Sequence, residues 1–196
     1  MPRIGRIAID QIDDGDVQDI ADHLLAYKGT IPDHYRLEGH IPDLLKHVWY
    51  AQEAVYEGGP LSRTLLRKVG IVVSMANGCP YCTGAYCSLL SSDFNDGDDA
   101  VEQFQNAVEE RSLSGFEADV VEFAYQVNDD PHAISDGDID YLRSEYDLPD
   151  TAFVQLVYQV NLVSGYNRLT TVFDAAYDHS YPQTLADREL GMDSDT

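Results

Sequence analysis

The sequence predicts an all-α, single-domain helical bundle, and three observations support this prediction. Apolar residues recur at helical spacing over most of the 196 residues. The alternation of apolar and polar residues that is typical of half-buried strands is absent from the sequence. Gly, Pro and Asn residues, which commonly end or start helices, separate the apolar segments. With 44% apolar residues, the chain is long enough to bury one substantial core.

The first quarter of the chain is predicted to contain two helices. Asp16 is placed to cap a short amphipathic helix, and a turn-rich segment, residues 29–39, follows it. Pro42 suits the first turn of the next helix, because the N–H that proline lacks has no intrahelical partner there. The Gly-Gly-Pro sequence at 58–60 is expected to stop this second helix.

Two further helices are predicted to meet at a sharp break. Apolar residues at helical spacing favour a helix over residues 61–76, and Asn77-Gly78 resembles a helix C-terminal cap. Pro80 then occupies the position expected for the first residue of a new helix, which makes Cys79 its N-cap.

The second half of the chain is predicted to add four helices, for eight in all. After an acidic loop at 93–99, one amphipathic helix is expected around Phe104. Ser114 and Glu117 have the spacing of a capping box for the next helix, which Asn-Asp-Asp-Pro at 128–131 ends. A short helix is expected around Ile139 and Leu142.

Asp150 is predicted to cap the last long helix, which is expected to reach about residue 177. We therefore divide the chain into an N-terminal helical extension (1–38), a helical domain (39–177) and an acidic C-terminal tail (178–196). The tail is polar, so we expect it to be mobile or to lie along a neighbour.

Charge is the second prominent property of the sequence. There are 35 acidic and 12 basic residues, which gives a net charge of −23. So negative a field repels nucleic acid and anionic membranes, and neither is an expected partner. The acidic residues are spread along a chain of ordinary apolar content, which indicates a halophilic protein folded in concentrated salt, where the screening length falls to ~3 Å. An acidic surface matched to a basic protein partner is the alternative interpretation.

The apolar segments are too short to span a membrane, for which about 18 consecutive apolar residues are needed. The N-terminal sequence lacks the charged and then apolar pattern of a secretory signal. The number of cysteines is odd, which is unusual for a secreted disulfide scaffold. These features favour a cytoplasmic protein.

The sequence Gly78-Cys79-Pro80-Tyr81-Cys82 carries the strongest functional signal. Two thiols at this spacing meet across one helical turn and can cycle between dithiol and disulfide. Unpaired N–H groups and the helix dipole at a helix N-terminus favour a thiolate. A thiolate that attacks an O–O bond becomes a sulfenic acid, which a second thiol converts to a disulfide.

Two other interpretations of the cysteine pair remain. A zinc site usually needs four ligands, and this chain has one pair, with His40 and His47 as distant candidates. Both cysteines could instead be buried and inert. We expect neither a metal nor another cofactor. Cys87 lies about 140° from Cys82 around the helix axis, so we expect it to serve packing.

The sequence resembles the alkylhydroperoxidase D-like branch of the carboxymuconolactone decarboxylase family. The resemblance rests on residues 59–69, on Met-Ala-Asn-Gly-Cys-Pro-Tyr-Cys at 75–82, and more weakly on 39–42 and 166–169. It implies an all-helical fold that assembles as a homotrimer or hexamer, with thiol-dependent peroxidase or disulfide-reductase chemistry. It also implies that Cys82 attacks the peroxide and Cys79 resolves, whereas the helix N-terminus slightly favours a thiolate on Cys79.

The sequence departs from the family at the proton relay. The family's glutamate, twelve residues before the first cysteine, is replaced by Arg67, and its histidine, four residues after the second, is replaced by Tyr86. Arginine cannot act as a base, and tyrosine is a poor one. Arg67 could stabilise a thiolate by its charge, or the site has lost catalysis. Both residues could also serve only packing and surface charge.

Several other side chains are candidates to support the cysteines. Tyr81, between the two cysteines, is one of them. His40 and His47 are the preferred histidines to replace the missing relay, because they precede the helix that leads to the motif. A surface or capping role is the alternative for each histidine.

The sequence therefore supports three functions. The first is a thiol-dependent oxidoreductase that reduces a small hydroperoxide or a disulfide through Cys79 and Cys82 and is recycled by an external thiol reductant. The second is a non-catalytic oligomer whose cysteine pair forms a structural or redox-sensing disulfide. The third is a lyase that resembles the lactone-acid decarboxylase branch, which does not rely on a cysteine pair.

Overall fold

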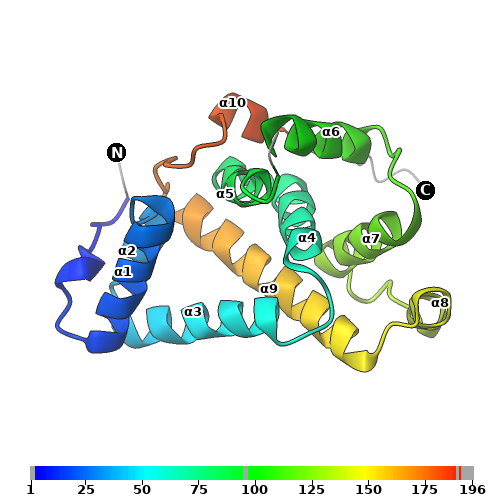
Figure 1. The fold of residues 1–196 in the computed structure, drawn as a ribbon, viewed down its shortest axis with the longest axis horizontal. Coiled ribbons are helices and arrows are strands. Elements are labelled where there is room, and N and C mark those ends of the chain that lie inside the picture. Colours follow the sequence, from blue (N-terminus) through cyan, green and yellow to red (C-terminus); the bar gives the residue numbers. More distant parts are fainter. Residues whose placement is uncertain (1–2, 95–96, 189, 191–196) are drawn as a thin grey trace.

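The computed structural model describes residues 3–94, 97–188 and 190, and over these residues the all-α prediction is confirmed (Figure 1). The described chain forms no strand. Its helices are a 3₁₀ turn η1 (Ile9–Gln11), α1 (Gly15–Lys28), α2 (Asp33–Glu38), α3 (Pro42–Glu57), α4 (Arg63–Ala76), α5 (Pro80–Ser91), α6 (Gly97–Glu109), α7 (Gly115–Asp129), α8 (Asp136–Tyr146), α9 (Asp150–Val172) and α10 (Gln183–Ala186).

Helix α4 lies at the centre of the main core, packed against α5, α7 and α9. It is buried on several sides, because Leu66, Val69, Ile71 and Val73 are all fully enclosed. Figure 1 shows α9 crossing the molecule beneath α4 and α5, so that the long helix supports both members of the central pair. This arrangement places the α4–α5 junction inside the fold, against α9.

The N-terminal segment has a smaller core of its own, in which η1 and α1 pack against α3. Two expectations were wrong here. Asp14, not Asp16, caps α1, since its side chain accepts the N–H of Val17. The segment expected to be only turns contains α2, which begins after Pro32. Pro32 has a fixed φ and an extended ψ, which suits the residue before a helix. The helix α2 can therefore start at the next residue, Asp33.

Two caps in the second half also differ from the prediction. The Ser114 side chain makes no capping hydrogen bond, and Glu117 forms an ion pair with Lys68 instead. A capping box does form one helix later, between Ser135 and Asp138. Asp150 is the first residue of α9 rather than its cap, because Pro149 occupies that position.

The C-terminal part of the chain packs against the rest of the fold. Helix α9 ends at Val172, before the expected end near residue 177, and side chains from residues 178–188 join the main core of the same chain. Tyr181 is 1% exposed, and its hydroxyl donates to Oε1 of Gln105 at 2.7 Å. Residues 189 and 191–196 of the predicted tail lie outside the described residues.

None of the helices in the described ranges has the length and apolar character required to cross a bilayer.

Candidate functional site

The α4–α5 junction places the two cysteines as the sequence predicted. Asn77 ends α4, Gly78 has a positive φ of 58°, and Cys79 becomes the N-cap of α5 with Pro80 in its first turn. Only glycine adopts such a backbone angle without strain. The Cys79 sulfur accepts the N–H of Cys82 at 3.4 Å, so the sulfur itself caps the helix. The cysteines are free thiols.

Helix α9 supplies a hydroxyl that lies between the two sulfurs. Thr170 Oγ1 is 3.3 Å from the sulfur of Cys79 and 3.3 Å from that of Cys82. The same hydroxyl lies 2.8 Å from the carbonyl of Tyr166, one helical turn earlier. Thr170 therefore contacts both members of the pair and fixes their position relative to α9.

The two thiols differ in acidity. The pKa of Cys79 is lowered, first by the hydrogen bond from the Cys82 thiol and then by Thr170, although burial opposes the shift. The pKa of Cys82 is raised, first by burial and then by its role as donor to Cys79. The first proton therefore leaves Cys79, and Cys82 remains a thiol that donates to the resulting thiolate.

A cavity of about 40 Å³ lies beside Cys82, and Thr170, Tyr81 and Lys28 are among its lining residues. A second cavity of about 260 Å³ shares Lys28 and Leu89 with it and extends to the exposed residue Thr30. Cys79 and Cys82 are only 2% and 3% exposed. Lys28 lines both cavities, so Cys82 shares its cavity with a basic side chain that also lines the larger one.

Both terminal segments contribute polar side chains around these two cavities. His34, from α2, lies 3.2 Å from the Tyr81 hydroxyl through Nδ1 and donates its backbone N–H to the same oxygen at 3.3 Å. Asp178 also interacts with the Tyr81 hydroxyl. The His179 ring packs edge-on against the Tyr81 ring at 4.4 Å between centroids. These groups surround Tyr81, the residue between the two cysteines.

The protonation states of this cluster follow from its burial. Burial lowers the pKa of His34 well below its ordinary value and lowers that of His179 to about 3, so both imidazoles are neutral at pH 7. Burial also lowers the pKa of Lys28, while the carboxylate of Asp178 acts in the opposite direction. Lys28 is therefore a more ready proton donor than a surface lysine.

The structure separates the sequence-predicted supporting residues into two groups. Tyr81 and Tyr86 line the cavity beside Cys82, and Gly70 leaves the space that the Tyr86 ring occupies. Arg67 instead forms an ion pair with Asp93 and donates to the carbonyl of Leu89 at 2.8 Å. The sequence suggested that the Arg67 guanidinium could stabilise a cysteine thiolate. In the structure the Asp93 carboxylate neutralises that charge instead.

His40 and His47 do not line the cysteine cavity. His40 Nε2 lies 2.9 Å from the carbonyl of Gly5, and His47 Nδ1 lies 2.6 Å from that of Asp43, within its own helix. The histidines at the site are His34 and His179, which the sequence allowed as candidates but did not favour over His40 and His47. Sequence reasoning missed Lys28, Thr170 and Asp178. Only Thr170 had a signal in the sequence, because it directly follows the 166–169 segment that resembles the family.

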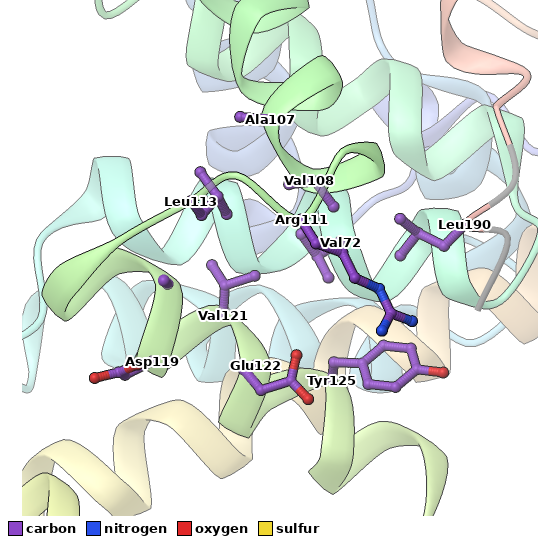
Figure 2. A pocket seen from close by; sticks show the side chains of 11 residues that line it. Val72, Ala107, Val108, Arg111, Leu113, Asp119, Val121, Glu122, Tyr125 and Leu190 are labelled. Atoms are coloured by element: carbon purple, nitrogen blue, oxygen red, sulfur yellow. The ribbon is translucent and has the colours of Figure 1, made fainter. Parts of the chain in front are cut away.

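Cys87 lies in the main core, where burial raises the pKa of its thiol to about 12. Within the described residues, no group of three or more His, Cys, Asp or Glu side chains is arranged to hold a metal ion. Figure 2 shows a separate cavity of about 280 Å³ between α6 and α7, in which the Arg111 side chain extends toward Tyr125. Cysteine and histidine are missing from its described lining, so thiol chemistry has no place there.

Comparison with solved structures identifies the fold. A protein from Ralstonia eutropha JMP134, described as an uncharacterised peroxidase-related protein with an alkylhydroperoxidase AhpD core, matches with a TM-score of 0.79 and 17% identity over 90% of this chain and 92% of that one. The chain has the alkylhydroperoxidase D-like fold. No protein-family model and no curated protein matches the sequence itself.

Two further structures share the alkylhydroperoxidase D-like fold with this chain. One is an uncharacterised peroxidase-related protein from Silicibacter sp. TM1040, with a TM-score of 0.77 and 17% identity over 90% of this chain and 93% of that one. The other is the debrominase Bmp8 in complex with 2,3,4-tribromopyrrole, with a TM-score of 0.69 and 18% identity over 88% and 90% of the two chains. At such identities the likeness extends to the fold.

Proposed function

We propose that the protein is a thiol-dependent peroxidase in which Cys82 attacks a small hydroperoxide and Cys79 resolves the product. One observation carries this proposal: Cys82 lines a cavity together with Lys28, while its thiol is hydrogen-bonded to Cys79. The assignment of Cys82 as the nucleophile agrees with the family resemblance. Because its pKa is lowered, Cys79 forms a thiolate first. In this proposal that thiolate acts as a base toward the Cys82 thiol and not as the nucleophile toward peroxide.

The cysteine pair can replace the missing Glu–His relay. In the resting pair the Cys82 thiol donates its hydrogen to the Cys79 thiolate. Transfer of that proton leaves a thiolate on Cys82 and a thiol on Cys79. The Cys82 thiolate then attacks one oxygen of the hydroperoxide, so that an S–O bond forms and the O–O bond breaks. The departing alkoxide takes a proton from the Lys28 ammonium, which lines the same cavity.

The second half of the cycle closes and reopens a disulfide. The Cys79 sulfur attacks the Cys82 sulfenic acid, and the hydroxyl group leaves with the Cys79 proton as water. An external thiol reductant returns two electrons and two protons to the pair. Lys28 regains its proton from solvent through the larger cavity. Because this cycle needs a reducing compartment, we place the protein in the cytoplasm.

The cavity volume selects among substrates. About 40 Å³ beside Cys82 holds a molecule of the size of hydrogen peroxide or a short alkyl hydroperoxide. A lactone acid of the decarboxylase-like alternative, or a brominated pyrrole as bound by the debrominase, exceeds this space. The cavity therefore favours the peroxidase over the lyase.

We further propose that the protein is a homo-oligomer. Residues 151–172 contain no acidic residue in a chain of net charge −23, although Val154, Tyr158 and Val172 on this segment are more than half exposed. Large apolar side chains that are exposed together on a segment without acidic residues are typical of a surface that another protein chain covers. The remaining surface carries the acidic residues, which suits a salt-adapted protein.

Hydrogen peroxide consumption by the purified protein with dithiothreitol tests the peroxidase. Cys82→Ser should abolish turnover. Cys79→Ser, treated with peroxide in the absence of dithiothreitol, should consume one equivalent more slowly than the wild type, because the base is lost, and should leave a sulfenic acid that dimedone labels. Cys87→Ser is the matched control and should retain the wild-type rate, because Cys87 lies in the main core. Lys28→Gln should slow the first oxidation severalfold without changing its stoichiometry.

Turnover that survives in Cys82→Ser would exclude Cys82 as the nucleophile. A wild-type dithiol that titrates and reoxidises but turns over no peroxide would support the non-catalytic, redox-sensing alternative. Decarboxylation of a lactone acid by a Cys79→Ser/Cys82→Ser double variant would support the lyase.

A further inference from the structure

His34 lines the small cavity beside Cys82, although it comes from α2, far from the cysteine motif in sequence. Its side chain belongs to a residue that is only 9% exposed, and its Nδ1 lies 3.2 Å from the Tyr81 hydroxyl. Its Nε2 makes no hydrogen bond to the described residues, yet it is not sealed from a water-sized molecule, in contrast to Nε2 of His179. His34 Nε2 is therefore available to a molecule in the cavity.

The hydrogen bonds around Tyr81 determine which nitrogen of His34 carries the hydrogen. Burial raises the pKa of Asp178, and hydrogen bonds from the Asp33 N–H and the Tyr81 hydroxyl act in the opposite direction. Because a carboxylate only accepts, the single hydrogen of the Tyr81 hydroxyl points to Asp178. The Tyr81 oxygen then accepts from the backbone N–H of His34 at 3.3 Å and from its Nδ1 at 3.2 Å. The imidazole of His34 therefore has its hydrogen on Nδ1 and a lone pair on Nε2.

The surroundings of His34 keep that lone pair free of a proton. Burial lowers the pKa of His34 well below its ordinary value, and Lys28 and His179 lower it further by charge. The rings of Tyr35 and Tyr166 pack against the imidazole at 4.0 and 5.1 Å between centroids. His34 is therefore a neutral hydrogen-bond acceptor that is held in place on both sides.

We propose that His34 is a further catalytic residue, whose Nε2 accepts the O–H of the hydroperoxide and holds the terminal oxygen for attack by Cys82. This inference rests on the proposed peroxidase and specifies which part of the substrate the site recognises. Hydrogen peroxide and alkyl hydroperoxides all carry such an O–H, whereas a disulfide has no hydrogen to donate. The acceptor therefore favours a hydroperoxide over a disulfide as the oxidising substrate.

The hydrogen bond to His34 is compatible with the balance of the oxidation step. The Cys82 thiolate attacks the terminal oxygen, so that an S–O bond forms and the O–O bond breaks. The second oxygen leaves as an alkoxide and takes a proton from the Lys28 ammonium. The hydrogen that His34 accepts stays on the transferred oxygen and becomes the hydrogen of the sulfenic acid. His34 neither gains nor loses a proton, as expected of an imidazole that stays neutral.

Two variants of His34 separate the roles of its two nitrogens. His34→Asn keeps an N–H near the position of Nδ1, for Tyr81, and has no atom at the position of Nε2. His34→Gln places its side-chain oxygen near the position of Nε2 and loses the contact with Tyr81. Oxidation of the full-length dithiol protein by hydrogen peroxide, followed in a single turnover, should slow about five- to tenfold in His34→Asn and at most about twofold in His34→Gln. A merely structural role would reverse this order, because only Asn keeps the bond to Tyr81.

Two controls show that the thiols themselves are unchanged. The thiolate absorbance at 240 nm should keep its midpoint in both variants, because His34 is not among the groups that shift the pKa of either thiol. His40→Asn should react at the wild-type rate, since His40 does not line the cysteine cavity and its Nε2 lies 2.9 Å from the carbonyl of Gly5.

The tautomer of His34 can be measured in the wild-type protein independently of any reaction. Long-range proton–nitrogen correlation spectra of protein with nitrogen-15 histidine should show the His34 hydrogen on Nδ1 at pH 7, with the resonances assigned through their loss in His34→Asn. Tyr81→Phe removes the acceptor of Nδ1 and should shift His34 toward the form with its hydrogen on Nε2.

The inference is wrong if His34 carries its hydrogen on Nε2 in the wild-type protein. It is also wrong if His34→Asn reacts with peroxide as fast as the wild type, and in that case the peroxidase itself stands, because Cys82 still reacts. A wild-type protein that does not react with peroxide would overturn the peroxidase and the role of His34 together.

Discussion

The α4–α5 junction and the two terminal segments serve the same site but are specified in different ways. The junction positions Cys79 and Cys82 through local backbone geometry, with a left-handed Gly78 and a helix that begins at Pro80. The terminal segments bring Lys28, His34 and Asp178 to the site from opposite ends of the chain. Local backbone geometry therefore places the thiols, whereas tertiary packing places the charged groups and proton donors around them.

The largest expected effect concerns the acidity of the junction itself. The thiolate absorbance of the wild-type protein at 240 nm should rise with pH through a midpoint near 6, because the pKa of Cys79 is lowered to about that value. Cys79→Ser should abolish this transition, and Cys87→Ser should preserve it. If no thiolate forms below pH 8 in the wild-type protein, the hydrogen bonds from the Cys82 thiol and backbone do not lower the pKa of Cys79.

The next expected effect tests whether the distant helix α9 tunes the local pair. Thr170→Val removes the hydroxyl that lies 3.3 Å from each sulfur and keeps the branched shape. The midpoint of the same titration should move upward by about one pH unit, and the peroxide reaction at pH 7 should slow up to about tenfold. Thr151→Val is the control, since this residue is exposed in the first turn of the same helix and is not among the groups that shift the pKa of either thiol. Equal midpoints in the two variants would show that the junction sets its acidity without α9.

A third prediction concerns the C-terminal segment that carries Asp178 and His179. Tyr181→Phe deletes the hydroxyl that donates to Gln105 and leaves the amide oxygen buried without that bond. We expect a loss of about 1–3 kcal/mol in the free energy of unfolding, measured by urea denaturation. Tyr27→Phe is the control, because Tyr27 is 54% exposed. If both variants unfold at the same urea concentration, docking of the C-terminal segment does not stabilise the fold.

The smallest expected effect concerns the N-terminal segment that carries Lys28 at the end of α1. Asp14→Ala removes the side chain that accepts the N–H of Val17 and should cost about 1 kcal/mol of stability. Asp16→Ala, at the position that the sequence favoured for the cap, should cost less, because Asp16 lies inside the first turn of α1. Denaturant midpoints of the two variants check the order, and a larger loss in Asp16→Ala would contradict the observed cap.

The sequence predicted the helix boundaries well where Gly, Pro or Asn residues end a helix. Gly-Gly-Pro at 58–60 ended α3, and Asn77-Gly78 separated α4 from α5, as expected. Predictions based on the spacing of two side chains were wrong where one of these side chains found another partner in the fold. Glu117 had the right spacing for a capping box, but pairing with Lys68 from α4 satisfied it instead. The short helices α2 and α10 were missed, because each is held mainly by packing against the rest of the fold.

The sequence by itself determined the all-helical class and the place of Cys79 and Cys82 at a helix start, since both depend on backbone preferences within a few residues. Only the tertiary structure decided which groups surround the sulfurs. It paired Arg67 with Asp93, left His40 and His47 elsewhere, and brought His34 and Thr170 to the motif. The physical reason is that hydrogen bonds and burial shift a thiol pKa over a few ångströms of space, and sequence spacing does not report distances between residues far apart in the chain.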